Sequence, residues 1–106
     1  MSAHKLRIEL SPRARSDVRN ILNYSGQQWG STQRARYRKR LNDGFDGIAA
    51  FPLIGRMRPE YGEGARSQKV DAYIVIYRPM SDRIVISRIL HQRQDIEGIM
   101  DVTAEQ

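Results

Sequence analysis

The residues in this sequence that are best suited to chemistry lie near the end of one apolar stretch, at Arg88, His91 and Arg93. Arginine can hold a phosphate or carboxylate through two parallel hydrogen bonds, and histidine can exchange a proton near neutral pH. Arg66 is a further candidate for such an anion-binding surface. We expect these four residues to form a binding site. A histidine at a strand end is also a common structural residue, so His91 has both interpretations.

Arg88 interrupts an otherwise apolar strand and therefore needs an explanation of its own. A charge in such a strand must be paired or must open onto a cleft, because an isolated buried charge is costly. One interpretation is a salt bridge to Asp17, Asp95 or another acid. The other is an exposed anion-binding role, and the sequence leaves both open.

Several kinds of site have no support in the sequence. Cysteine is absent, which excludes disulfides, thiolate metal sites and cysteine nucleophiles, and fits a reducing cytosol. The two histidines, His4 and His91, lie at opposite ends of the chain, and neither has a second metal ligand at usable spacing. Neither G-x-S-x-G nor a phosphate-binding glycine pattern occurs. We expect no metal site and no cofactor.

The length and charge of the chain limit its organisation and its partners. A chain of 106 residues forms one domain, and no apolar run approaches the roughly 18 residues of a membrane span. No secretory signal is visible at the N-terminus. The net charge is +6, and the excess lies before residue 47, mainly in Arg34, Arg36, Arg38, Lys39 and Arg40. This cluster is either a surface for an acidic partner or a solvated helix face.

The elements that position these residues begin with a strand and two helices. Residues 5–10 alternate between apolar and charged, as in a half-buried strand. Ser11-Pro12 is a helix start, and the apolar spacing predicts helices over about 12–28 and 32–50. Gly30 ends the first helix, so the short connection predicts an antiparallel helical hairpin. The core-facing residues of the second helix are Tyr37, Leu41, Phe45 and Ile48.

The second half of the chain has the pattern of a sheet. Residues 52–64 are rich in proline and glycine and predict a loop. Strands follow over about 65–70, 73–77 and 83–91, and a short helix over 96–100. The order predicts one α+β domain over residues 1–106, with the helical hairpin packed on a mostly antiparallel sheet and a short C-terminal helix.

A series of short motifs runs through about residues 5–100 in an order that is more specific than any one of them. They are Leu10-Ser11-Pro12, Ala14, Asp17, Ile21, Tyr24, Trp29-Gly30, Tyr37, Leu41, Phe51-Pro52, Gly55-Arg56, Arg66, Tyr73, Ile76-Tyr77, Arg88-Ile89-Leu90-His91, Arg93 and Asp95-Ile96. In order and spacing the chain resembles the ParE-type toxins of bacterial type II toxin–antitoxin systems, within the RelE/ParE superfamily.

The resemblance implies a ParD-like antitoxin, whose C-terminal segment wraps the toxin and whose N-terminal half binds operator DNA. We expect an amphipathic segment of the antitoxin to lie over the helical hairpin and the sheet edge. It also implies a cytoplasmic bacterial protein with a role in plasmid stabilisation. No membrane partner is expected, and no nucleic-acid contact except through the antitoxin complex. The residues expected to bind the antitoxin are Trp29, Arg34, Tyr37, Arg38 and Leu41.

The superfamily has two activities, and the residues help to choose between them. RelE-like members cut mRNA in the ribosome, whereas ParE-like members are described as poisoning DNA gyrase. RelE-like nucleases carry an arginine after the aromatic residue that opens the central strand, where this chain has Ile74. Their terminal tyrosine corresponds to Ile99, and of their lysines only Arg66 and Lys69 are near equivalents. Of the residues that RelE-like nucleases use, only the arginine at the position of Arg93 is retained in this chain.

RNA cleavage requires groups that activate the 2′-hydroxyl, stabilise the phosphate and protonate the leaving oxygen. One retained arginine cannot supply all three. We therefore expect a toxin that inhibits DNA gyrase by binding, without catalytic residues, and that contacts its target through Arg66, Arg88, His91 and Arg93. The alternative is a ribosome-dependent mRNA endonuclease that uses His91, Arg88 and Arg93. A third interpretation is an inactive member that only binds its partner.

Overall fold

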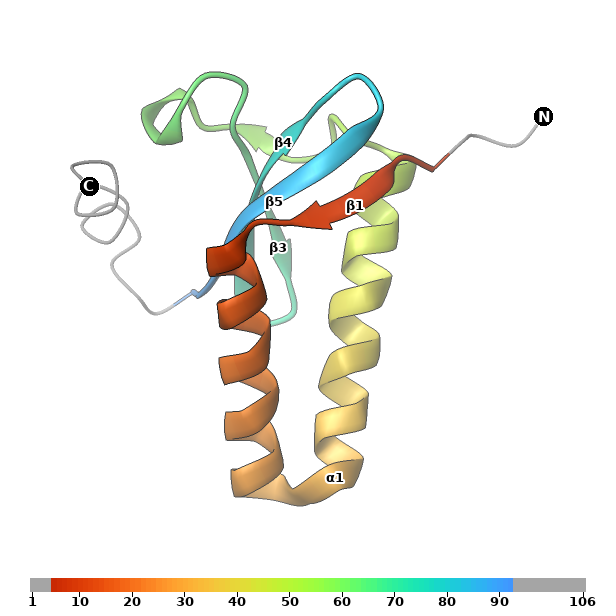
Figure 1. Ribbon diagram of the computed structural model, residues 1–106, viewed down its shortest axis with the longest axis vertical. Coiled ribbons are helices and arrows are strands. Elements are labelled where there is room, and N and C mark those ends of the chain that lie inside the picture. Colours follow the sequence, from red (N-terminus) through yellow and green to blue (C-terminus); the bar gives the residue numbers. More distant parts are fainter. Residues whose placement is uncertain (1–4, 93–106) are drawn as a thin grey trace.

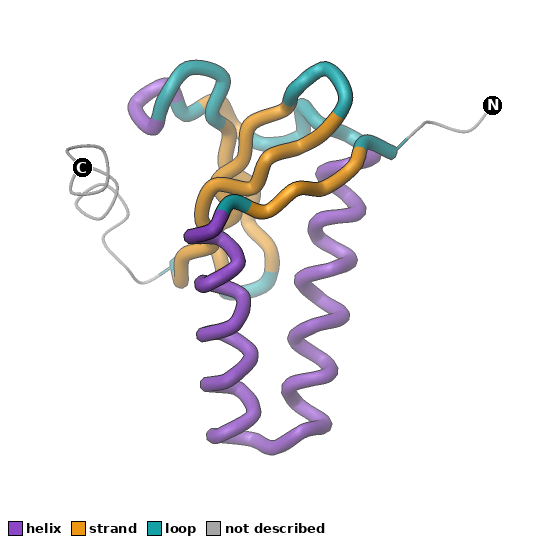
Figure 2. Tube along the Cα trace, viewed as in Figure 1, coloured by secondary structure: helices purple, strands orange, loops and turns teal. Residues whose placement is uncertain are grey.

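The structure, a computed structural model, describes residues 5–92, except for the side chains of residues 25–29. Its two parts are a long helix bent back on itself and a five-stranded sheet (Figure 1). The two arms of the bent helix run antiparallel, and their tip extends beyond the sheet. Figure 2 shows most of the loops at the opposite end of the molecule from that tip. The predicted α+β architecture is confirmed.

The bent helix is α1, Pro12–Ala50, and its start follows from local chemistry. Ser11 caps it, since its hydroxyl accepts a hydrogen bond from the Ala14 N–H at 3.0 Å, and Pro12 fills the first helical position. Gly30 interrupts the helical path with φ 86°, a conformation that glycine adopts without strain. The connection between the two arms is thus shorter than predicted, a single non-helical residue.

The sheet contains β1 (Arg7–Leu10), β2 (Arg56–Met57), β3 (Arg66–Val70), β4 (Tyr73–Pro79) and β5 (Arg83–His91). Its strand order is β1-β5-β4-β3-β2. The pairs among β2, β3, β4 and β5 are antiparallel, and β1 pairs parallel with β5. The connection between β1 and β5 contains α1 and the strands β2, β3 and β4, and it is long enough for the two strands to run parallel.

The prediction of a loop over residues 52–64 was wrong in part. This stretch contains β2 and a short 3-10 helix, Pro59–Tyr61. A strand of two residues, such as β2, is too short to show the alternation of apolar and polar side chains by which strands are recognised in a sequence. The prolines and glycines on either side of it favour turns. The predicted short helix over 96–100 lies outside the described residues. No helix among residues 5–92 has the length and apolar character needed to cross a membrane.

The core lies between the helical arms and one face of the sheet. Its central buried cluster is Ala14, Leu41, Phe45, Ile48, Val70, Val75, Tyr77, Ile84, Ile86 and Ile89. Gly44 permits the close approach of the second arm to β3, because a Cβ there would lie 2.6 Å from Val70 Cγ1. Gly47 has no such role, since a Cβ added there would meet nothing within 4 Å.

A β-bulge in β5 decides which way Arg88 faces. Tyr77 pairs with Ile86, whereas the residue before Tyr77 pairs with Arg88, so Ser87 is the extra residue. An extra residue changes the alternation of side chains between the two faces. Consequently Ile89, and not Arg88, joins the core cluster after the bulge.

Candidate functional site

The bulge of β5 is held by the first arm of α1. The Ser87 carbonyl oxygen accepts a hydrogen bond from the Ser11 hydroxyl at 2.9 Å, and the Ile89 N–H donates to Asp17 Oδ2 at 2.8 Å. A bulge interrupts the ladder of backbone hydrogen bonds, so such groups need other partners. Two side chains from the start of α1 supply them.

Asp17 also pairs with Arg88, in the arrangement that the sequence left open. Arg88 Nε and Nη2 donate to the two carboxylate oxygens at 3.0 and 3.3 Å. The side chains of Arg88 and Asp17 are only 13% and 14% exposed. Arg88 Nη1 is buried without a hydrogen-bond partner in the described part of the chain. Arg88 therefore belongs to a nearly buried ion pair that joins α1 to β5.

A small hollow of about 330 Å³ lies beside this ion pair, and we call its surroundings the corner site. Its aromatic wall is made by Tyr73, which lies opposite His91 across β4 and β5 and meets the imidazole edge to face at 5.5 Å. Tyr37 approaches Tyr73 from the second arm at 6.3 Å. The residues that line the hollow are Asp17, Asn20, Ile21, Tyr24, Tyr73, Arg88, Ile89, Leu90 and His91.

The environment of the corner site favours the neutral form of Tyr73. Burial raises the pKa of its phenol, and the charges of Tyr37, Asp71 and Tyr24 raise that pKa further. The phenol is thus a hydrogen-bond donor at neutral pH. With the arginine already paired, the corner offers aromatic surface and hydrogen-bonding groups, which suit binding.

Arg66, another predicted member of this site, is not brought to it. Arg66 lies opposite Tyr77 on β3, and its Nη1 donates to the carbonyl oxygens of Leu53 and Gly55 at 3.3 and 2.8 Å. It therefore holds the loop after α1. Arg93 lies outside the described residues.

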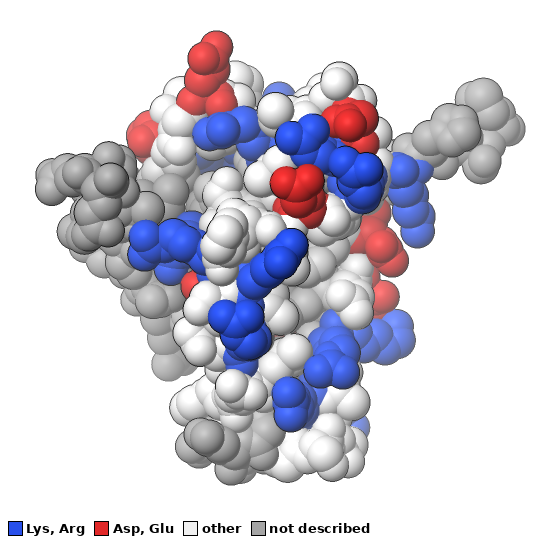
Figure 3. Space-filling view, in the orientation of Figure 1, with Lys and Arg blue, Asp and Glu red and all other residues white. Residues whose placement is uncertain are grey.

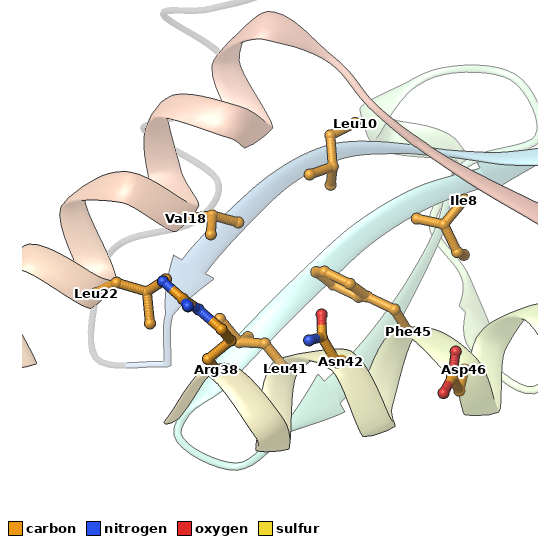
Figure 4. A pocket seen from close by; sticks show the side chains of 9 residues that line it. All are labelled: Ile8, Leu10, Val18, Leu22, Arg38, Leu41, Asn42, Phe45 and Asp46. Atoms are coloured by element: carbon orange, nitrogen blue, oxygen red, sulfur yellow. The ribbon is translucent and has the colours of Figure 1, made fainter. Parts of the chain in front are cut away.

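A larger groove of about 550 Å³ runs between the two arms of α1 and β1, and we call it the helix groove. Figure 4 shows side chains from all three elements pointing into it, with the phenyl ring of Phe45 at the centre. The side chain of Arg38 lies across the groove, between the side chains of Leu22 and Leu41. The lining residues are Ile8, Leu10, Val18, Leu22, Arg38, Leu41, Asn42, Phe45 and Asp46.

Basic side chains surround this groove. Figure 3 shows lysine and arginine spread along the helical arms on the face in view, with few acids between them. Arg34, Arg36 and Arg38 are exposed and form no ion pair among residues 5–92. Lys39 is paired with Asp43, by contrast, and Arg40 with Asp71. An apolar floor with basic walls suits an acidic, amphipathic segment.

The residues expected to contact an antitoxin are divided between the two sites. Arg34 and Arg38 lie on the exposed surface of the second arm, and Arg38 lines the helix groove. Leu41 forms part of the groove floor, but it is only 3% exposed. Tyr37 packs against Tyr73, on the side of the corner site. The side chain of Trp29 lies outside the described part of the structure.

Comparison with known proteins gives a family match over most of the chain. Residues 8–96 match the family described as ParE toxin of type II toxin-antitoxin system, parDE. Toxin ParE1 of Mycobacterium tuberculosis is 32% identical over 89 residues, which cover 83% of this chain and 91% of that protein. Toxin ParE1 of Caulobacter vibrioides is 36% identical over 83 residues, covering 78% and 85%.

Two solved structures share the fold at low sequence identity. The chromosomal ParDE toxin–antitoxin system from P. aeruginosa matches with a TM-score of 0.68 at 16% identity, covering 84% of this chain and 98% of that one. The toxin–antitoxin complex RelBE2 from Mycobacterium tuberculosis matches with a TM-score of 0.58 at 20% identity, covering 83% and 99%. The fold is thus one that toxins of both named types adopt.

Proposed function

The chain belongs to the ParE toxin family of type II toxin–antitoxin systems, and from this premise we propose that it inhibits DNA gyrase by binding to it. We propose further that a ParD-like antitoxin neutralises it in the bacterial cytoplasm. No catalytic residue is needed for this action, because the toxin acts by occupying a surface of its target.

The observation that carries this proposal is the pairing of Arg88 with Asp17. In a nuclease, a cation at such a corner would have to meet the phosphate whose charge grows during cleavage. Here two of the three guanidinium nitrogens are committed to one carboxylate, and the third is enclosed. Ile74, at the place where nucleases of the superfamily carry an arginine, supplies no replacement. The corner site therefore lacks a free arginine for the phosphate, which favours an action by binding over RNA cleavage.

The helix groove supports the antitoxin part of the proposal. Its floor is apolar, the exposed Arg38 lines it, and Arg34 lies one helical turn earlier on the same face of α1. An amphipathic antitoxin segment would bury its apolar face on the partly exposed Leu10 and Val18 and place its acidic residues among the arginines. Such a segment would cover much of the basic surface that gives this chain its charge.

The two activities of the superfamily can be separated in cells. The chain would be expressed from an inducible promoter, and the topology of a reporter plasmid and the integrity of an mRNA would be followed at the same time points. We expect the plasmid to lose supercoils while the mRNA stays intact. Early mRNA cleavage that disappears in His91→Ala would instead support the endonuclease.

A further inference from the structure

A second surface, at the end of the molecule opposite the hairpin tip, exposes apolar side chains. Figure 1 shows the chain leaving α1 there and running behind the β4–β5 hairpin to β2. Four of the six large apolar side chains that are exposed in the described chain fall within residues 51–57. They are Phe51 (64% exposed), Leu53 (68%), Ile54 (53%) and Met57 (66%), and we call them the loop patch.

The loop patch is held in place by hydrogen bonds with Tyr77 and Arg66. The Tyr77 hydroxyl donates to the Pro52 carbonyl oxygen at 2.8 Å and accepts from the Gly55 N–H at 2.9 Å. Arg66 donates to the carbonyl oxygens of Leu53 and Gly55. Gly55 must be glycine, since a Cβ would lie 2.7 Å from the Tyr77 hydroxyl. A loop fixed in this way presents its apolar side chains without a further cost of ordering.

The loop patch ends in an open sheet edge. β2 is the last strand of the sheet, and the Arg58 N–H donates to the Ala65 carbonyl oxygen at 2.8 Å, on the side of β3. Backbone groups alternate between the two sides of an antiparallel strand, so the N–H and C=O of Met57 face away from β3. An extended segment can add beside such an edge through backbone hydrogen bonds. Arg56, which is exposed and forms no ion pair among the described residues, lies next to it.

We propose that the loop patch and the β2 edge are the surface through which this toxin docks on DNA gyrase. The segment of gyrase that fits here is extended, with apolar residues against Leu53 and Met57 and an acidic residue near Arg56. This inference rests on the proposed function and assigns that function to a surface other than the corner site.

The charge of this surface and the presence of the helix groove distinguish this occupant from two others. The four side chains expose on the order of 500 Å² of apolar surface, at the upper end of patches on ordinary monomers. Stable complexes bury roughly 800 Å² on each partner, so any lasting partner of the loop patch must also use the β2 edge. A twofold dimer at β2 would bring two copies of Arg56 together. The antitoxin has a larger and more basic surface at the helix groove.

The test is the affinity of immobilised toxin for purified gyrase holoenzyme, measured by biolayer interferometry. The variant Leu53→Gln with Met57→Gln changes two exposed side chains, and a thermal unfolding curve checks that it is folded. Met80→Gln is the matched control, because Met80 is an exposed methionine on the β4–β5 turn, outside the loop patch. A parallel titration measures the affinity of each variant for the cognate antitoxin, whose binding we assign to the helix groove.

We expect the double variant to bind gyrase about tenfold more weakly or worse, while Met80→Gln binds like the wild type. Antitoxin affinity should stay within about twofold in both. If the double variant binds gyrase as tightly as the wild type, the loop patch is not the docking surface. A loss of antitoxin affinity alone would overturn the inference too and assign the patch to the antitoxin. If the wild type itself does not bind gyrase, the proposed function fails, and this inference fails with it.

Discussion

Asp17 and Arg88, 71 positions apart in the sequence, form a nearly buried ion pair at the bulge of β5. The same carboxylate accepts the Ile89 N–H, so three hydrogen bonds converge on one side chain. Their geometry makes Asp17 the link between the first helical arm and the strand that carries the corner site. Arg88 is therefore a structural residue in this chain.

Replacing Asp17 by alanine should be strongly destabilising. Removal of one partner leaves the Arg88 charge buried and unpaired, and such a change costs about 3–5 kcal/mol of unfolding free energy. Urea unfolding followed by circular dichroism measures this. Asp43→Ala is the control, because the Asp43–Lys39 pair is exposed and its loss should leave the unfolding midpoint unchanged. A small effect of Asp17→Ala would contradict the structural role assigned to Arg88.

The two glycines of the second arm should respond in opposite directions to alanine. Gly44→Ala places a methyl group against Val70 and should cost about 1–3 kcal/mol, as overpacking in a core does. Gly47→Ala meets no atom within 4 Å and should stabilise the helix by about 0.5–1 kcal/mol. Thermal unfolding of the two variants makes the comparison, and equal shifts would mean that the second arm does not approach β3 closely.

The raised pKa of Tyr73 gives a prediction at alkaline pH. Burial, with the neighbouring charges, makes the folded chain hold the phenol proton above the usual pKa of about 10. The unfolded chain releases that proton first, so stability falls as the pH rises from about 10 through the raised pKa. Tyr73→Phe should show a smaller loss between pH 9 and pH 11 in urea unfolding. Identical pH profiles would show that Tyr73 is not shielded from solvent.

The basic second arm should control the rate at which the antitoxin associates. Replacing Arg34, Arg38 and Arg40 by glutamate should slow association at low salt by about tenfold or more and weaken its salt dependence. Stopped-flow fluorescence with the cognate antitoxin measures the rate. Arg56→Glu, an exposed arginine on β2, is the control and should leave the rate nearly unchanged. An unchanged rate in the triple variant would show that the antitoxin approaches elsewhere.

Local patterns were enough to predict the helical hairpin and the β4–β5 hairpin, because both depend on residues close in sequence. The parallel pairing of β1 with β5 was not predicted, since it joins strands separated by α1 and the three other strands. The two-residue strand β2 was missed for lack of any alternation to recognise.

The candidate site was predictable only in outline, for a similar reason. The sequence named Asp17 as one possible partner of Arg88, but the choice depends on how α1 packs on the sheet. Arg66 has the residue type of an anion-binding group, yet its position on β3 turns it to the loop after α1. The loop patch was not foreseen, because its apolar residues lie among the prolines and glycines of a stretch interpreted as a loop.

The most direct test of the central claim is a supercoiling assay with purified gyrase, relaxed plasmid, ATP and increasing amounts of this toxin. We expect supercoiling to fall as toxin is added and to return when the cognate antitoxin is added in equal amount. His91→Ala should inhibit as the wild type does, because His91 lines the corner site and not the loop patch that we propose as the docking surface. Gyrase that remains fully active at saturating wild-type toxin would contradict the account.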